Sequence, residues 1–380
     1  WLVNSLKKND LYFDMSLLKN LRKKIRIRKH FDFQFFRHTS ILKQVKRKVS
    51  KKNSKISKNY LLRLLKEYLL REKKYSYNTN SSNIWDPIFN NFQKNLKSTL
   101  NSKDNKKIEN ILDNPGNTNL FIGFENNVSE KDWTNKIEHM YALDKLLSFA
   151  EFLGIKDIYN PEQDNISVKK IDIEGLLTKI EKKTRLKLKF QNVFPGESGF
   201  LTSRGILNEK EIQALYAAYK ISKIINKNQS ILEIGAGLGR TAYYCSLFGI
   251  KDYTIVDIPI SFLAQGNYLG RVLSEKKIVF ENELLKKYEK NKIKLITPEY
   301  FLKNKTRYDL ILNCDSLTEI NYELAYKYMQ KIKKSKYFYS INHEKNTFNV
   351  SALIEKFKFK YYSRNLYWLR KGYIEEFVKF

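Results

Sequence analysis

The stretch ILEIGAGLGRTAYYCSLFGIKDYTIVDIP, residues 231–259, decides the fold. It contains an apolar run, three alternating glycines, a helix-like segment and a second apolar run that ends on an acid. Gly235, Gly237 and Gly239 let the backbone pass close to a ligand where any Cβ would collide. This order predicts a buried strand, a tight glycine turn, a helix and a second, parallel strand.

Two acids beside this turn indicate the kind of ligand. Glu233 stands two residues before Gly235, and Asp257 follows at the end of the second strand. A carboxylate at that strand end can accept hydrogen bonds from both ribose hydroxyls of an adenosine. The glycines are spaced G-x-G-x-G, whereas dinucleotide-binding proteins use G-x-G-x-x-G, so the pattern disfavours NAD.

The C-terminal half continues the alternation of helix and strand. It begins at Asn208, which forms a helix-capping pattern with Glu211 three residues later. The apolar runs that follow are SILEIG, YTIVDI, IKLIT, YDLILNC and YFYSIN. Such runs, separated by helix-like segments, are typical of a parallel sheet covered on both faces, and they predict an α/β, Rossmann-like fold. Residues 357–380 are rich in strand formers and predict a closing hairpin.

Composition divides the chain into three parts. We expect a basic helical arm and linker over 1–83, a mostly helical region over 84–205, and the parallel-sheet domain over 206–380. Up to Lys74 the chain has 23 basic and 5 acidic residues, which leaves +18 of the net charge there. This arm contains one amphipathic helix, NYLLRLLKEYLLREKK. The sequence FPGESGFLTSRG, residues 194–205, predicts a glycine-rich loop.

The net charge of +31 predicts attraction to polyanions. Residues 1–74 therefore fit a surface for anionic lipid or, as a weaker alternative, RNA. They also fit a helical extension whose charges are only solvated. A biased base composition of the genome enriches lysine, so the excess of positive charge does not by itself require a partner. Two cysteines inside apolar runs exclude a disulfide framework and a zinc cluster. We expect a cytoplasmic protein at the inner face of a membrane, since no apolar run approaches the ~20 residues of a membrane span.

The glycine motif and its acids resemble motif I of class I S-adenosylmethionine-dependent methyltransferases. The blocks YTIVDIP, LITPEYF, YDLILNCDSLTEI and YFYSIN resemble the sugar O-methyltransferase family of bacterial surface-polysaccharide gene clusters. Upstream, IWDPIFNNF, NPGNTNLFIGFEN and FPGESGFLTSRG extend this resemblance, which spans about residues 84–380. It implies a Rossmann-like methyltransferase fold and S-adenosylmethionine as cofactor. It also implies a carbohydrate acceptor, either a capsule or lipopolysaccharide unit or its nucleotide-sugar or lipid-linked precursor.

The resemblance also implies which residues bind the cofactor. It places the methionine moiety against the glycine turn and the ribose on Asp257, while Ile258 packs on the adenine and Thr297 lies near its edge. Glu299 is an alternative for the adenine contact. The full cofactor-binding set is Glu233, Gly235, Gly237, Gly239, Asp257, Ile258, Thr297 and Asn313.

Methylation of a sugar hydroxyl is helped by a general base, which we expect at the carboxyl ends of the fourth and fifth strands. His343, the only histidine of residues 206–380, is the first choice, although it also fits a loop histidine without a role. Asp315 orients the acceptor, binds a divalent cation or only caps its strand. Glu319 joins this catalytic group or simply begins a helix.

Two other functions remain open at this point. The first is an RNA methyltransferase that uses the basic arm. The fourth predicted strand of this chain ends on NCDS, whereas enzymes that methylate exocyclic amines of bases have Asn/Asp-Pro-Pro-Tyr at that position. The sequence also has no Pro-Cys, which would supply the nucleophile for C5 methylation of pyrimidines. Both observations argue against methylation of a base. The second is a non-catalytic module that binds S-adenosylmethionine or a polyanion. The intact glycines and the two acids Glu233 and Asp257 argue against the second alternative.

Overall fold

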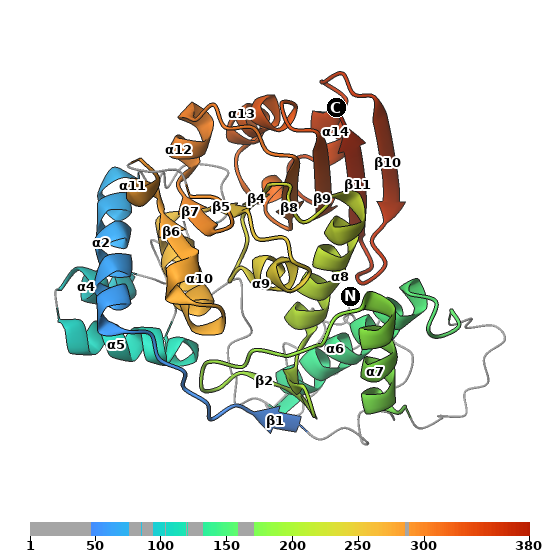
Figure 1. Ribbon diagram of the computed structural model, residues 1–380, viewed down its shortest axis with the longest axis horizontal. Helices are drawn as coiled ribbons and strands as arrows, with labels where there is room; N and C mark the ends of the chain where they lie inside the picture. The colour runs from blue at the N-terminus through green and yellow to red at the C-terminus, as the bar shows by residue number, and fades with distance from the viewer. Residues whose placement is uncertain are drawn as a thin grey trace, which may run out of the picture.

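A computed structural model describes residues 47–75, 85, 94–102, 104–118, 120, 132–158, 171–285 and 289–380. Most of the predicted arm, residues 1–46, lies outside the described residues, as does most of the linker. Within the described residues there is an eight-stranded sheet and a smaller three-stranded sheet (Figure 1). None of the described helices is both long and apolar enough to cross a bilayer.

The large sheet has the order β10-β11-β9-β8-β4-β5-β7-β6. Its strands are β4 (Ile231–Ile234), β5 (Tyr253–Val256), β6 (Ile278–Phe280), β7 (Ile293–Ile296), β8 (Leu310–Cys314), β9 (Tyr337–His343), β10 (Tyr361–Leu366) and β11 (Tyr373–Lys379). Strands β4 to β9 pair in parallel, while β11 is antiparallel to both of its neighbours. The five predicted strands and the closing hairpin are confirmed. The short strand β6 is an addition.

Helices cover both faces of this sheet, as predicted. They are α8 (Glu209–Ile224), α9 (Arg240–Leu247), α10 (Pro259–Val272), α11 (Glu281–Leu284), α12 (Pro298–Lys303), α13 (Tyr322–Ile332) and α14 (Val350–Ile354). Successive residues of one strand enter different cores: Ile231 packs in the cluster that contains α8, α9 and α10, and Leu232 in the cluster that contains α13 and α14. This alternation makes β4 apolar on both faces, because a doubly covered strand meets no water. The predicted cap of α8 is present, since the Asn208 side chain accepts a hydrogen bond from the Glu211 amide at 3.1 Å.

The region before α8 is mostly helical, as predicted, but it also contains the smaller sheet. Its helices are α4 (Lys94–Asn101), α5 (Asn105–Asp113), η2 (Pro115–Asn117), α6 (Asp132–Phe152) and α7 (Ile173–Thr184). The antiparallel strands are β1 (Arg47–Val49), β2 (Ser198–Thr202) and β3 (Gly205–Leu207). The expectation of a loop over 194–205 is therefore wrong from Ser198 onward. A Cβ on Gly199 would lie 2.2 Å from the Leu207 carbonyl oxygen, so this glycine serves strand pairing.

The amphipathic helix of the predicted arm is α2 (Lys58–Lys74), and it packs against α10 (Figure 1). Its apolar face is buried there, and the Tyr60 hydroxyl donates a 2.9 Å hydrogen bond to the Gly266 carbonyl. Arg71 donates to the Leu295 carbonyl of β7 at 2.6 Å. This part of the arm therefore belongs to the protein core, and its apolar face is not available to a lipid surface.

Candidate functional site

A cavity of about 420 Å³ lies at the carboxyl ends of the parallel strands. Strands β5 and β8 flank β4 on opposite sides, so the chain leaves β4 at the point where the strand order reverses. Open α/β sheets bind ligands in the crevice at that point, because the loops after the two neighbouring strands diverge there. The cavity is lined by residues from the ends of β4, β5 and β8 and from α8.

The glycine turn forms one wall of this cavity. Gly235, Gly237 and Gly239 have φ values of 69°, 56° and 84°, in the left-handed region that side chains disfavour. A Cβ on Gly235 would lie 2.2 Å from the Ser316 hydroxyl oxygen, so the turn also needs the missing side chain for space. The first two glycines line the cavity, and Gly239 caps α9. The predicted strand, glycine turn and helix are confirmed.

Asp257 lies at the end of β5 and lines the same cavity. One carboxylate oxygen accepts a hydrogen bond from the Ile258 amide at 2.9 Å. The other accepts from the Ala236 amide at 3.2 Å and from the Gln265 side chain at 2.6 Å. Burial raises the pKa of Asp257 to about 6. The two backbone amides fix a carboxylate beside the glycine turn, as a ribose-binding acid requires.

Glu233 also reaches the cavity, although it is almost completely buried. Its carboxylate accepts a 2.8 Å hydrogen bond from the Tyr253 hydroxyl. Burial raises its pKa to about 7, an effect to which the nearby Asp257 adds. Two acids with raised pKa values therefore lie at one end of the cavity.

The other predicted cofactor-binding residues differ in position. Ile258 lines the cavity, as does Glu299. Thr297 does not line it, because its hydroxyl caps α12 by accepting from the Tyr300 amide at 3.1 Å. Asn313 does not line it either, since its amide bridges β4, β8 and β9 through the Ile234 carbonyl and the Asn342 side chain. Both side chains are thus used to hold the strand ends together.

The three predicted catalytic residues come together at the carboxyl ends of β8 and β9, which lie on the other side of β4 from β5. Asp315 follows β8, Glu319 ends the short helix η5 (Leu317–Glu319), and His343 ends β9. One potential ligand atom from each lies within 4.8 Å of the others, so the set has the spacing needed to hold a metal ion. Of the three, Asp315 lines the cavity, and Glu319 and His343 do not.

Asp315 is held in place by three neighbours. Its φ of 55° is in the left-handed region, and its carboxylate oxygens each lie 3.0 Å from the Tyr373 hydroxyl, which donates to them. Arg370 approaches the same carboxylate at 3.3 Å. The His343 Nε2 lies 3.9 Å from the nearer carboxylate oxygen, and its ring packs edge-on against Tyr373. A guanidinium thus already balances the charge of Asp315.

Glu319 has a partner that sequence reasoning did not find. The indole nitrogen of Trp85 donates a 2.8 Å hydrogen bond to its carboxylate. Burial, followed by the charge of Asp315, raises the pKa of Glu319 to about 7. Trp85 lines the cavity together with Tyr75, Tyr367 and Tyr373, and of these Trp85 and Tyr373 contact the predicted catalytic residues directly. None of them carries a spacing signal in the sequence.

Comparison with known proteins assigns no family to this chain. No family model matches the sequence, and no curated protein matches it either. Three similar solved structures are a ribosomal protein L11 methylase from Lactobacillus delbrueckii subsp. bulgaricus, a glycopeptide N-methyltransferase complexed with S-adenosyl-L-homocysteine, and magnesium protoporphyrin IX methyltransferase from Synechocystis PCC 6803 with the same ligand.

These likenesses are distant. The sequence identities are 14%, 10% and 14%, and the TM-scores are 0.31, 0.34 and 0.31. The matches cover 45%, 44% and 44% of this chain and 79%, 89% and 82% of the three solved chains. At such values a reaction cannot be transferred from one protein to another. The function of this chain is therefore argued from its own cavity.

Proposed function

We propose that this chain is an S-adenosylmethionine-dependent O-methyltransferase that acts on a sugar hydroxyl. The observation that carries the proposal is the meeting of two groups of residues in one cavity. Gly235, Gly237 and Asp257 line it after β4 and β5, and Asp315, whose carboxylate lies 3.9 Å from the His343 Nε2, lines it after β8. The first group suits an adenosyl cofactor, and the second suits a hydroxyl that must lose a proton.

The residues of the glycine turn fit S-adenosylmethionine. Gly235 and Gly237 leave open the space that side chains would fill, and Asp257 offers acceptor oxygens to the ribose hydroxyls. The backbone amides of Ala236 and Ile258 hold the Asp257 carboxylate beside the turn. Bound there, S-adenosylmethionine supplies an electrophilic methyl group on a sulfonium. The acids Glu233 and Asp257 favour its positive charge.

Asp315 and His343 act on the acceptor. Their nearest polar atoms are 3.9 Å apart, and the His343 Nε2 also lies 3.3 Å from the Asn346 side-chain nitrogen, a contact that the acceptor hydroxyl would replace. Asp315 orients this hydroxyl, and the His343 Nε2 takes its proton as the new O–C bond forms and the S–C bond breaks. The carboxylate of Asp315 then stabilises the imidazolium. Such a base contributes about 10²–10⁴-fold, and the alignment of donor and acceptor lowers the barrier by roughly 7–11 kcal/mol.

The class of acceptor rests on the sequence resemblance, and the shape of the cavity is compatible with it. Tyr75, Trp85, Tyr367 and Tyr373 line the cavity with aromatic rings, and Lys210 adds a cation. We propose as acceptor a unit of capsule or lipopolysaccharide, in its nucleotide-sugar or lipid-linked form. RNA is the competing acceptor, and the net charge of +31 favours it.

Methyl transfer into fractionated host extract tests the proposal. The full chain is incubated with S-adenosylmethionine labelled on its methyl group, and carbohydrate, RNA and protein fractions are counted separately. The matched control is the Asp257→Ala variant, which keeps the catalytic group and lacks the ribose-binding acid. We expect label in carbohydrate with the natural chain and none with the variant.

The other outcomes separate the alternatives. Label in RNA would replace the sugar acceptor by a nucleic acid and leave methyl transfer standing. Saturable binding of S-adenosylmethionine without label in any fraction would support the non-catalytic module. A chain that neither binds S-adenosylmethionine nor transfers label would overturn the whole proposal.

A further inference from the structure

A second hollow, of about 1100 Å³, lies away from the methyl-transfer cavity. It is bounded by Leu247 at the end of α9, by Leu273 just after α10, by residues 187–192 and by the turn between β2 and β3. Helices α9 and α10 both begin at the carboxyl ends of their strands, where the first cavity lies. The second hollow, which we name the basic groove, is therefore at the other end of these helices.

The basic groove has a strong excess of positive charge. Lys51, Lys52, Lys187, Lys189 and Lys277 line it, and all five are exposed. Within the described ranges of the chain, none of these five side chains forms an ion pair. Lys187 and Lys189 alternate with the buried Leu186, Leu188 and Phe190, so the extended chain directs both amines outward.

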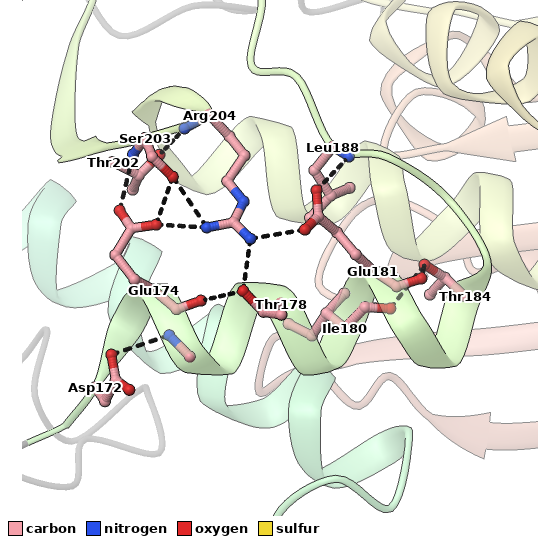
Figure 2. A network of polar contacts seen from close by, with 11 residues as sticks. Asp172, Glu174, Thr178, Ile180, Glu181, Thr184, Leu188, Thr202, Ser203 and Arg204 are labelled. Carbon is pink, nitrogen blue, oxygen red and sulfur yellow. Dashed lines mark hydrogen bonds and ion pairs between the residues drawn. The ribbon is translucent and has the colours of Figure 1, made fainter.

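The one acid that lines the groove is already used. Glu181 of α7 binds the guanidinium of Arg204 at 2.7 Å and also accepts from the Leu188 amide at 2.8 Å. Glu174 holds the other side of the same guanidinium and accepts from Ser203 (Figure 2). This network fastens α7 to the β2–β3 turn and to the segment that carries the lysines. These contacts hold the wall of the basic groove together. The charged side chains of the groove that form no ion pair among the described residues are all lysines.

Two exposed leucines lie among these lysines. Leu201 is 49% exposed, because it is the one outward-facing residue of β2, and Leu247 is 38% exposed. Both line the groove. Exposed apolar side chains next to clustered lysines are the combination that peripheral membrane proteins use at the boundary between headgroups and acyl chains.

We propose that the basic groove docks the protein on an anionic phospholipid bilayer. The lysines meet lipid phosphates, and Leu201 and Leu247 enter the interfacial layer. The sequence before β1 has the same sign of charge, since residues 1–46 include 12 basic and 3 acidic residues. Docking there leaves the methyl-transfer cavity free, since the two hollows lie at opposite ends of α9 and α10.

A single-stranded nucleic acid fits the groove less well. Such chains stack their bases on exposed aromatic faces. Among the described residues, the aromatic side chains that line the groove are Phe190 and Tyr243, which are 3% and 2% exposed. The Tyr243 hydroxyl is also engaged by Gln191 at 2.9 Å. The groove therefore offers charge and aliphatic surface without a stacking platform.

Vesicle co-sedimentation of the full chain tests the proposal. One set of vesicles is phosphatidylcholine alone, and the other contains equal parts of phosphatidylcholine and phosphatidylglycerol. We expect binding to the second set that falls with salt, because the Debye length shortens. The Lys187→Gln/Lys189→Gln variant should partition about thirtyfold more weakly, since each lysine near such a surface contributes about 1 kcal/mol. Leu201→Ser should weaken binding by itself.

The matched control is Lys358→Gln/Lys360→Gln, which removes the same charge with the same spacing from exposed lysines outside the groove. We expect this control to bind vesicles as the natural chain does. Equal losses in the two lysine pairs would overturn the groove as the docking site and leave only net charge. Binding to oligouridylate that depends on Lys187 and Lys189, without vesicle binding, would overturn lipid as the partner. Unchanged binding of S-adenosylmethionine confirms that each variant is folded.

Discussion

The indole nitrogen of Trp85 lies 2.8 Å from a carboxylate oxygen of Glu319, across a separation of 234 residues. This contact brings a residue from before the parallel-sheet domain onto the catalytic group. Glu319 is largely withdrawn from water, and both burial and the charge of Asp315 raise its pKa to about 7. The hydrogen bond acts in the opposite direction, because a donor stabilises the ionised carboxylate.

Replacing Trp85 by phenylalanine should therefore raise the pKa of Glu319 further. Phenylalanine keeps an aromatic ring and lacks the donor, and a hydrogen bond to a charged group accounts for about one pKa unit or more. Carbon-13 NMR of labelled glutamate side chains measures the titration. Trp368→Phe is the control, because Trp368 does not line the cavity. A Glu319 titration that is the same in both variants would contradict the role of the indole.

Asp257→Ala should weaken binding of S-adenosylmethionine about a hundredfold, because two hydrogen bonds from ribose to a charged acceptor contribute about 3 kcal/mol together. Calorimetry measures the affinity. The control is Asp309→Ala. Asp309 also holds strand ends together, because it accepts from the Ser230 amide at 2.8 Å, but it lies at the amino ends of β4 and β8, away from the cavity. The control should lose stability and retain affinity. An equal affinity in both variants would show that the ribose does not contact Asp257.

The parallel sheet and its glycine turn could be predicted because each leaves a local pattern. Doubly covered strands are continuous apolar runs, and a left-handed turn that passes close to a ligand selects glycine. Strand β6 was missed because only three residues, Ile278–Phe280, stand between polar neighbours. Thr297 and Asn313 belonged to the cofactor-binding set that the resemblance implies, and a resemblance does not reveal that a side chain caps a helix or bridges strands.

The packing of segments that are far apart in the chain, such as α2 on α10, left a weaker signal in the sequence. The amphipathic pattern of α2 defines an apolar face, but it does not say what covers that face. A clue was present in α10, where Gly266 and Gly270 are one turn apart. A Cβ at these positions would meet Leu64 at 2.4 Å and Tyr60 at 2.7 Å, so the glycines permit the close approach of α2. Trp85 carried no clue, because a single indole has no periodicity.

His343→Ala should bind S-adenosylmethionine normally and lose turnover by about 10²–10⁴-fold, the range of a general base. The imidazole contacts Asp315 and does not line the cavity, so we expect its removal to leave the residues around the glycine turn in place. Calorimetry and methyl-transfer rates separate the two effects. Lys345→Ala, at an exposed position two residues later, is the control. An intact rate in His343→Ala would assign the base to Asp315.

Turnover should survive removal of divalent cations. Asp315, Glu319 and His343 have the spacing to hold an ion, but Arg370 already lies 3.3 Å from the Asp315 carboxylate. A guanidinium at that distance competes with a cation for the same charge. Methyl-transfer rates with and without EDTA measure the effect. If activity is lost with EDTA and restored by Mg²⁺, the three residues bind a metal, and Asp315 gives up its contact with Arg370 when the metal binds.

Glu233→Gln should be more stable than the natural chain at alkaline pH. Burial raises the pKa of Glu233 from its ordinary 4.5 to about 7, so the folded state favours the protonated form. The stability that this proton gives is fully present below the unfolded pKa and is lost as the pH rises through about 7. Glutamine resembles the protonated acid and still accepts from the Tyr253 hydroxyl. The variant should therefore match the natural chain at pH near 4.5 and exceed it by about 3 kcal/mol at pH above 8.

Urea unfolding followed by tryptophan fluorescence measures this difference across the pH range. Glu109→Gln is the control, because Glu109 is an exposed carboxylate on α5. We expect the free energy of unfolding of Glu233→Gln to diverge from that of the natural chain between about pH 5 and 8, and that of Glu109→Gln to follow the natural chain throughout. A constant offset at every pH would mean that Glu233 keeps its proton, or its charge, equally in the folded and unfolded states. The raised pKa of Glu233 would then be wrong.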